Sequence, residues 1–265
     1  MTRRQMPSAL TIAGSDSSAG AGIQADLKTF AARGVYGTSA LTAVTAQDTR
    51  AVHAVAVLPP AVVRSQIDAV LADLGADAVK TGMLGSAAVV AAVADAVSAH
   101  AVRRLVVDPI LHASGGRALL GRGGVAALGE RLLPLAEIVT PNLAEASVLV
   151  GFPVRDVRAM EEAARRLVDA GARAAVVTGG HLAGDAVDVV FAGGRLVRLR
   201  AARVGGPAPH GTGCTFAAAI AAERAKDVPL IEAVRAAKRY VTACIRRARL
   251  LGHGRPILGH LAIDS

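Results

Sequence analysis

A glycine turn that leads into an alanine-rich helix is the feature of this sequence that most constrains its fold. The turn reads His210-Gly211-Thr212-Gly213-Cys214-Thr215-Phe216, and residues 217–222 are alanine apart from one isoleucine, a strong helix-forming composition. Glycine allows the tight turn, and the helix start offers unpaired N–H groups at the positive end of its dipole, which suits phosphate. Cys214 falls in the first helical turn, where we expect the same field to lower the thiol pKa below about 8.5. One segment would then supply an anion site and a base; the alternative is an ordinary helix start with a buried cysteine.

Short runs of Val, Ile and Leu recur about every thirty residues, the length of a strand–helix–strand unit. We predict strands at residues 9–13, 40–45, 78–80, 105–108, 138–140 and 174–178, with helical stripes between them. This alternation predicts an α/β fold, with a mostly parallel sheet covered on both faces. Residues 186–205, with Gly193-Gly194 between two alternating strands, predict a hairpin that adds an antiparallel edge. Without a linker or repeat, residues 1–265 are expected to form a single domain.

The amino-acid composition limits the classes of ligand that we expect the protein to bind. Hydrophobic residues make up 52% and charged residues 19% of the 265 positions, which is typical of an ordered globular protein. The net charge of +9 suits anionic ligands, but aromatic residues at 2% leave little to stack on nucleic-acid bases. The longest uncharged run, residues 205–222, is broken by Gly, Pro and His and predicts no membrane span. We therefore expect a phosphorylated small molecule as the ligand, with no nucleic acid and no membrane.

Two cysteines, Cys214 and Cys244, form neither a disulfide framework nor a metal-ligand spacing. The apolar run that follows the basic start of the chain is too short for a signal peptide. Both observations predict a reducing, cytoplasmic setting. The sequence also contains no P-loop, H-E-x-x-H, C-x-x-C or G-x-S-x-G motif.

Polar residues follow the predicted strands where each strand ends. In chain order they are Gly14-Ser15-Asp16, Gln47-Asp48, Lys80-Thr81-Gly82-Met83, Asp108-Pro109, Thr140-Pro141-Asn142 with Glu145, and Thr178-Gly179-Gly180-His181. In open parallel sheets, ligands bind at the carboxyl ends of the strands. We therefore expect these segments to converge on one edge of the sheet.

Three carboxylates stand out among the polar residues. Asp26 faces partly inward on its helix, so it needs a ligand or an ion-pair partner such as Lys28 or Arg33. Asp108 ends an apolar strand and Glu145 opens a helix, and two such oxygen ligands suit Mg²⁺ together with substrate phosphates. The alternative for Glu145 is compensation of the helix dipole in the first turn.

Eight segments follow one another in a characteristic order along nearly the whole chain. They are residues 9–16 (ALTIAGSD), 22–30 (GIQADLKTF), 42–47 (TAVTAQ), 80–84 (KTGML), 107–110 (VDPI), 140–146 (TPNLAEA), 179–182 (GGHL) and 210–215 (HGTGCT). Because it has these eight segments in this order, the chain resembles the hydroxymethylpyrimidine/phosphomethylpyrimidine kinases of thiamine biosynthesis, in the ribokinase-like superfamily. The resemblance implies a three-layer α/β/α sandwich, and it implies phosphorylation of 4-amino-5-hydroxymethyl-2-methylpyrimidine to the monophosphate and then to the diphosphate, with ATP and Mg²⁺ as cofactors.

The same resemblance implies roles for individual residues. It implies that the pyrimidine is bound by Gly14, Asp26, Gln47, Met83 and Ile110. It implies catalytic roles for Gly211, Thr212, Gly213 and Cys214. It further implies that the nucleotide is bound by Asn142, Thr178, Gly180, Thr212 and Gly213, and that the metal is bound by Asp108 and Glu145. Relatives of this fold also suggest a homodimer.

The chain departs from the family pattern in places. Thr178 stands where the family's lysine is expected, so a phosphate-reaching cation is missing unless Lys80 or an arginine substitutes. In the loop that follows Ile110, we expect Gly115-Gly116 to hinge a lid.

Other functions stay open at this point. A pyridoxine or pyridoxal kinase on the same fold would ask for similar contacts. A nucleic-acid-binding module would use Arg103, Arg104, Arg246, Arg247 and Arg249, and it would show a steep salt dependence. A non-catalytic sensor of the pyrimidine is a third alternative, against which the complete 210–215 turn weighs.

Overall fold

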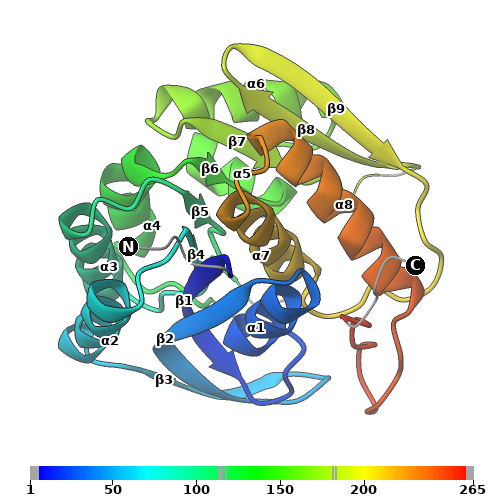
Figure 1. The fold of residues 1–265 in the computed structure, drawn as a ribbon. Coiled ribbons are helices and arrows are strands. Elements are labelled where there is room, and N and C mark those ends of the chain that lie inside the picture. The colour runs from blue at the N-terminus through cyan, green and yellow to red at the C-terminus, as the bar shows by residue number, and fades with distance from the viewer. Residues whose placement is uncertain (1–5, 113–115, 117, 181, 183, 261–265) are drawn as a thin grey trace.

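One sheet organises the molecule (Figure 1). The computed structural model describes residues 6–112, 116, 118–180, 182 and 184–260. Within them, nine strands lie in the order β3-β2-β1-β4-β5-β6-β7-β8-β9. Their bounds are β1 Ser8–Asp16, β2 Tyr36–Gln47, β3 Val52–Val57, β4 Ala78–Thr81, β5 Leu105–Val107, β6 Ile138–Val139, β7 Ala174–Val177, β8 Ala186–Ala192 and β9 Arg195–Ala201.

Helices cover both faces of this sheet. One core cluster joins the sheet to α2, α3, α4, α5 and α6 with the short helices that follow α4, and the other joins it to α1, α7 and α8. The bounds are α1 Gly22–Ala32, α2 Pro60–Asp73, α3 Ala87–Ala99, α4 Gly124–Ala127, a π-helical turn Leu128–Leu132, a 3₁₀ turn Leu133–Leu135, α5 Leu143–Val150, α6 Val157–Asp169, α7 Thr212–Ala225 and α8 Leu230–Arg246. The predicted α/β/α sandwich is therefore what the chain forms. No helix in the described ranges combines the length and apolar character that crossing a bilayer requires.

Alternating residues of the central strands feed the two cores. In β5, Leu105 and Val107 face one helical layer while Val106 faces the other, and all three side chains are buried. A strand that is covered on both faces buries every residue, which is why these strands read as continuous apolar runs rather than alternating ones.

The sheet is parallel in its centre and antiparallel at both edges. Strands β2, β1, β4, β5, β6 and β7 pair in parallel, and the predicted hairpin β8–β9 turns at Gly193 and Gly194, whose φ angles are +54° and +73°. At the opposite edge, β3 pairs antiparallel with β2. This second edge was not predicted, and β3 buries none of its residues.

Strand β1 lies at the topological switch point, since the chain runs from β1 to β2 on one side and later to β4 on the other. Two irregularities of register occur here. The β1–β2 pairing shifts between Ala13 and Ser15, around Gly14, and the β2–β3 pairing shifts between Ala46 and Gln47. Bulges of this kind redirect side chains at the ends of strands. Both lie at residues that the family resemblance assigns to the pyrimidine.

Candidate active site

The glycine turn begins α7 as the sequence predicts. Gly211 is the N-cap residue with φ +85°, and no side chain caps the helix. A Cβ at Gly211 would overlap the carbonyl oxygen of Gly20, so both its conformation and its surroundings require glycine. A Cβ at Gly213 would meet no protein atom within 4 Å. The first N–H groups of α7 therefore open toward space that a ligand can occupy.

Cys214 lies in the first turn of α7, but its thiol does not have the expected acidity. Burial raises the pKa of Cys214 to about 12, and the positive charge of Lys80 offsets only part of that rise. The negative charges of Asp108 and Asp26 raise the pKa further. The lowered pKa expected from the helix start was therefore wrong, because loss of water and two neighbouring carboxylates dominate. At neutral pH the group is a thiol.

Asp26 is paired with a partner that the sequence did not reveal. Its Oδ2 accepts hydrogen bonds from the Lys80 Nζ at 2.8 Å and from the Thr11 Oγ1 at 2.6 Å, and the ion pair is fully buried. The two suggested partners are occupied elsewhere: Lys28 donates to the Ala19 carbonyl and Arg33 pairs with Glu223. The second oxygen, Oδ1, is buried without a partner among the described residues.

The protonation of this pair follows from its surroundings. Burial raises the pKa of Asp26, and the positive charge of Lys80 offsets only part of this rise. Burial alone would lower the pKa of Lys80, but the negative charges around it, with Asp26 first, raise it above its ordinary value. We assign the charged pair, since a neutral Asp26 would leave a buried ammonium without its nearest counter-charge.

Asp108 directly follows β5 and Glu145 lies in the first turn of α5, after β6, where the charge of Asp108 acts on it. Burial raises the pKa of Asp108 to about 6, and the positive charge of Lys80 and the side chains of Cys214 and Thr140 offset part of that rise. Burial, followed by the charge of Asp108, raises the pKa of Glu145 to about 8. The Oδ2 of Asp108 is buried with no partner in the described part of the chain. Two buried carboxylates with raised pKa values, one of them raised in part by the charge of the other, fit a divalent cation.

Glu145 also has a local role in the first turn of its helix, where the alternative interpretation placed it. Asn142 caps α5 by accepting from the N–H groups of Ala144 and Glu145, and Glu145 accepts in return from the Asn142 N–H, which makes a capping box. The described residues contain no group of three His, Cys, Asp or Glu side chains arranged for a metal. A cation here would therefore rely on two carboxylates and on ligand oxygens.

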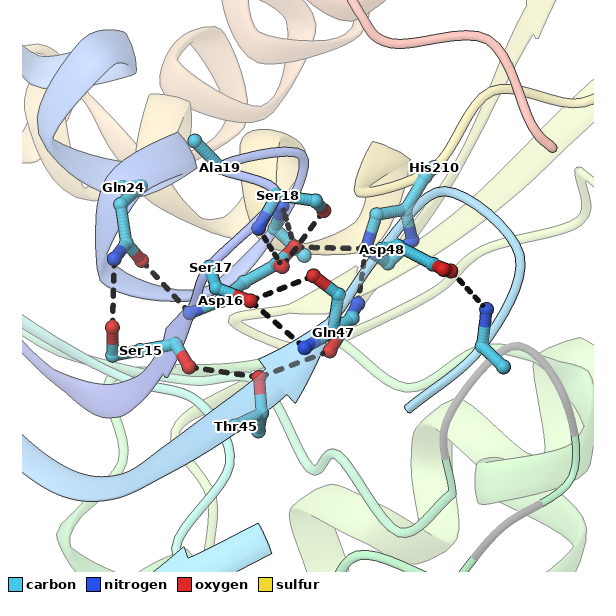
Figure 2. Close-up of polar contacts among 12 residues, drawn as sticks. Ser15, Asp16, Ser17, Ser18, Ala19, Gln24, Thr45, Gln47, Asp48 and His210 are labelled. Atoms are coloured by element: carbon cyan, nitrogen blue, oxygen red, sulfur yellow. Dashed lines mark hydrogen bonds and ion pairs between the residues drawn. The ribbon is translucent and has the colours of Figure 1, made fainter. Parts of the chain in front are cut away.

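The residues assigned to the pyrimidine lie around the switch point. A Cβ at Gly14 would come within 3.2 Å of the Met83 sulfur, so the two residues are close neighbours. Gln47 lies at the end of β2, where its N–H and carbonyl group both bond to the Ser17 hydroxyl (Figure 2). Ile110 is half-buried after β5.

The residues assigned to the nucleotide adjoin one another after β6 and β7. Asn142 and Thr178 form a β-bridge, and the Thr178 N–H donates to the Pro141 carbonyl. Lys80 is not the missing cation, because it is buried on Asp26. An arginine does lie there: Arg203 donates to the carbonyl oxygens of Gly180, Leu182 and Gly184. Gly115 of the expected lid hinge and His181 lie outside the described residues.

His210 joins the two ends of the site and was not singled out by sequence reasoning. Its Nε2 is 3.0 Å from the Asp16 Oδ2 and 2.8 Å from the Gln47 Nε2, as Figure 2 shows. Its backbone N–H donates to the Pro256 carbonyl, and Gly20 packs against its ring. Its position directly before the glycine turn was the one signal that could have marked it.

A parallel sheet between two helical layers, with an uncapped glycine turn opposite paired carboxylates at the strand ends, defines a class: small-molecule kinases of the ribokinase-like fold. Comparison with known proteins narrows this class. Residues 16–258 match the family model described as phosphomethylpyrimidine kinase. The chain belongs to that family, as the ordered motifs predicted.

Individual relatives agree. The chain is 52% identical over 256 residues to the hydroxymethylpyrimidine/phosphomethylpyrimidine kinase of Rhizobium meliloti, which covers 95% of this chain and 96% of that protein. It is 51% identical over 255 residues to the thiamine biosynthesis bifunctional protein of Geobacter sulfurreducens, which covers 96% of this chain and 52% of that protein. The chain thus spans about half of the bifunctional relative and nearly all of the other.

Solved structures give the same fold. The ADP complex of Bacillus subtilis pyridoxal kinase superposes with a TM-score of 0.92 at 40% identity, covering 98% of this chain and 99% of that chain. The ribokinase-like sandwich, the kinase class and the use of an adenine nucleotide are therefore supported together.

Proposed function

We propose that this chain transfers the terminal phosphoryl group of ATP to the hydroxymethyl group of 4-amino-5-hydroxymethyl-2-methylpyrimidine, and then phosphorylates the monophosphate to the diphosphate. Membership of the phosphomethylpyrimidine kinase family supports the reaction class. The observation that carries the proposal is the meeting of three groups at one edge of the sheet: Asp26, the Asp108–Glu145 pair and the turn at 211–214, linked by the charges around Lys80.

Asp26 supports recognition of an amine. Its Oδ2 is occupied by Lys80 and Thr11, while Oδ1 is buried and unpartnered within the described ranges. A buried carboxylate oxygen without a donor costs free energy that a ligand N–H can return. The exocyclic amine of the pyrimidine is such a donor. Met83, beside Gly14, would supply flat apolar contact to the ring.

The start of α7 supports binding of the transferred phosphoryl group. Phosphoryl transfer depends on alignment and charge neutralisation rather than on covalent help. We propose that the N–H groups of Thr212, Gly213 and Cys214 hold the phosphoryl oxygens, an effect worth about 3–4 kcal/mol per donor in other enzymes. The open space at Gly213 would let those oxygens approach the backbone.

Asp108 and Glu145 would hold the Mg²⁺ ion. The unpartnered Asp108 Oδ2 and the raised pKa of Glu145 both fit a cation between them. When bound, Mg²⁺ neutralises charge on the phosphates. The adjoining Asn142, Thr178 and Gly180 would contact the nucleotide, and Arg203 would fix the 180–184 loop in place of the lysine that Thr178 replaces.

Cys214 would take the proton of the substrate hydroxyl in the first step. Because its pKa of about 12 keeps the thiol protonated, the sulfur can accept that proton only as its own proton leaves. The Asp108 carboxylate, whose charge acts on the Cys214 thiol, would receive that proton on the oxygen that does not hold the metal. The second step uses a phosphate oxygen that is already ionised, so it needs no such base.

We also propose a cytoplasmic homodimer that binds neither nucleic acid nor membrane, formed as one domain. The sequence has two cysteines, at positions 214 and 244, which make no disulfide framework and so suit a reducing compartment. Val44 and Val57 are 45% and 42% exposed on β2 and the edge strand β3, and they offer an apolar surface for a second copy.

The test of the function is product analysis by mass spectrometry after incubation with the aminopyrimidine, ATP and Mg²⁺. We expect the monophosphate to appear first and the diphosphate later. Pyridoxal in equal concentration serves as the competitor, because the same fold is found in pyridoxal kinase. Preferential phosphorylation of pyridoxal would replace the proposed substrate, and absence of any phosphorylated product would remove the proposal.

A further inference from the structure

A hydrogen-bond network of fixed direction lies between the expected pyrimidine site and the glycine turn (Figure 2). At its centre, one nitrogen of His210, Nε2, contacts both the Asp16 carboxylate and the Gln47 amide. The His210 side chain is 15% exposed and that of Asp16 is 4% exposed. Little water can therefore reach these polar groups, so each donor needs an acceptor within the network.

The carboxylate of Asp16 fixes the proton on His210. Asp16 already accepts from the Ser18 N–H, the Ser18 hydroxyl and the Ala21 N–H. Burial alone would raise the pKa of Asp16, but these hydrogen bonds and the one from His210 lower it. An ionised carboxylate only accepts hydrogen bonds. The His210 Nε2, at 3.0 Å from the Asp16 Oδ2, must therefore carry a hydrogen.

This hydrogen determines which way the Gln47 amide turns. A nitrogen that carries a hydrogen cannot accept one from an amide NH₂, so the Gln47 group that faces His210 must be the amide oxygen. The two ends of an amide have nearly the same shape, and their assignment follows from the network. With the oxygen toward His210, the NH₂ faces Thr45, whose hydroxyl lies 3.3 Å from the other end of the Gln47 amide.

In this arrangement each of these contacts joins a donor to an acceptor. The Thr45 hydroxyl gives its hydrogen to the Ser15 carbonyl at 3.0 Å, which leaves its lone pairs for the Gln47 NH₂. The opposite amide orientation would need a bare Nε2, whose lone pair would face the Asp16 charge. The network therefore has one consistent direction, from Gln47 to Thr45 to Ser15 and from His210 to Asp16.

We propose that His210 is a positioning residue for Gln47. It shares its Nε2 hydrogen between Asp16 and the Gln47 amide oxygen, and this contact orients the Gln47 NH₂ toward the substrate. Gln47 then reads a hydrogen-bond acceptor, a ring nitrogen, while Asp26 with its free Oδ1 reads an adjacent amine. This donor–acceptor pair matches an aminopyrimidine edge. The inference rests on the proposed function for its substrate and extends it to how the substrate edge is selected.

The proton position is testable without substrate. Two-bond ¹H–¹⁵N correlation spectra at pH 7, with His210→Phe to assign the signals, report which ring nitrogen of His210 is protonated. We expect a hydrogen on Nε2. A neutral ring protonated on Nδ1 alone would overturn the proposal, whatever the substrate proves to be.

The consequence for selectivity is tested with two variants. His210→Phe keeps an aromatic ring but has no donor, whereas His210→Gln has two N–H groups that can serve Asp16 and Gln47. The probes are the aminopyrimidine and an analogue in which the ring nitrogen next to the amine-bearing carbon is replaced by C–H, each measured by calorimetry. We expect the wild type and His210→Gln to prefer the pyrimidine by about tenfold or more, and His210→Phe to lose that preference.

Two further comparisons separate positioning from general damage. Combined with Gln47→Ala, His210→Phe should cause no further loss of selectivity, because its effect passes through Gln47. The KM for ATP should change much less than the KM for the pyrimidine. Unchanged selectivity in His210→Phe overturns the inference while leaving the function intact. A wild type that does not bind the pyrimidine removes both.

Discussion

Lys80 and Asp26 form an ion pair that solvent does not reach, with the Lys80 Nζ 2.8 Å from the Asp26 Oδ2. The pair joins β4 to α1, and the Thr11 hydroxyl of β1 donates a further hydrogen bond to Asp26. The positive charge of Lys80 also acts on Asp108 and on the Cys214 thiol. The fold therefore determines the electrostatic environment of the site, because it places the buried charge of Lys80 next to these groups.

Removing one partner of this pair should be costly. Lys80→Met leaves an unpaired buried carboxylate, for which we expect a loss of about 3–5 kcal/mol in the free energy of unfolding. Urea denaturation measures it. The matched control is Arg131→Ala, which breaks an exposed pair with Asp95 and should cost less than about 1 kcal/mol. Equal losses in the two variants would show that burial does not determine the value of the pair.

Replacing the thiol should separate the two phosphorylation steps. Cys214→Ser lacks a group that can pass a proton as readily, so the first step, which must deprotonate an alcohol, should lose far more of its rate than the second. Single-turnover assays that start from the alcohol and from the monophosphate measure the two steps independently. Equal losses would refute the role of Cys214 as a base.

The pH dependence of the first step distinguishes a relay from a free thiolate. If Asp108 receives the proton, the rate should rise as Asp108 ionises, at or below its metal-free pKa of about 6 because Mg²⁺ favours the ionised carboxylate, and then stay level to pH 9. A free Cys214 thiolate would instead give a rate that keeps rising, because its pKa is about 12. The pH profile of kcat for the alcohol decides between them.

Glu145 should make stability depend on pH and on Mg²⁺. Its pKa is about 8 in the folded protein against 4.5 as the ordinary value, so the folded state keeps a proton that the unfolded chain has released. Stability should fall as pH rises between these values. Mg²⁺ should then raise Tm more at pH 8 than at pH 5, since it binds the ionised carboxylates.

The control is Glu145→Gln, which keeps an oxygen to accept the Asn142 N–H and so preserves the capping box. Its Tm should vary less with pH, and Mg²⁺ should add little at either pH. A full Mg²⁺ shift in Glu145→Gln would place the ion elsewhere. Differential scanning fluorimetry provides all of these values.

Two glycines of the turn should respond differently to alanine. Gly211→Ala meets both a φ of +85° and the Gly20 carbonyl, so it should unfold the turn and lower Tm. Gly213→Ala meets no protein atom, so Tm should hold while activity falls, because the methyl group occupies space expected for phosphoryl oxygens. Full activity in Gly213→Ala would argue against phosphoryl binding at this turn.

The sequence predicted those parts of the fold that local pattern determines. Apolar runs such as residues 105–107 mark buried strands, and the glycine turn at 211 marks the start of α7, since both depend on neighbouring residues. The strand β3 was not predicted; its residues are apolar except for His53, but none of them is buried at this edge of the sheet. The family motifs identified the kinase family without reference to packing.

What the sequence could not supply was the electrostatic environment. Asp26 and Lys80 are 54 positions apart, and only the folded sheet brings them into contact. The acidity of Cys214 was wrongly expected to follow the helix start, because its burial and its carboxylate neighbours depend on segments distant in sequence, α1 and the end of β5. His210 was overlooked for the same reason: Asp16 and Gln47 reach it from the ends of β1 and β2.

The backbone contact between His210 and Pro256 bears on how the enzyme is made. Within the described residues, the nine strands and α7 all precede Pro256 in the chain. A nascent polypeptide stalled on the ribosome before that proline would already have these strands, yet it would lack the bond that steadies the residue in front of the glycine turn. Phosphoryl transfer should therefore arise only after the strands of the scaffold have been synthesised.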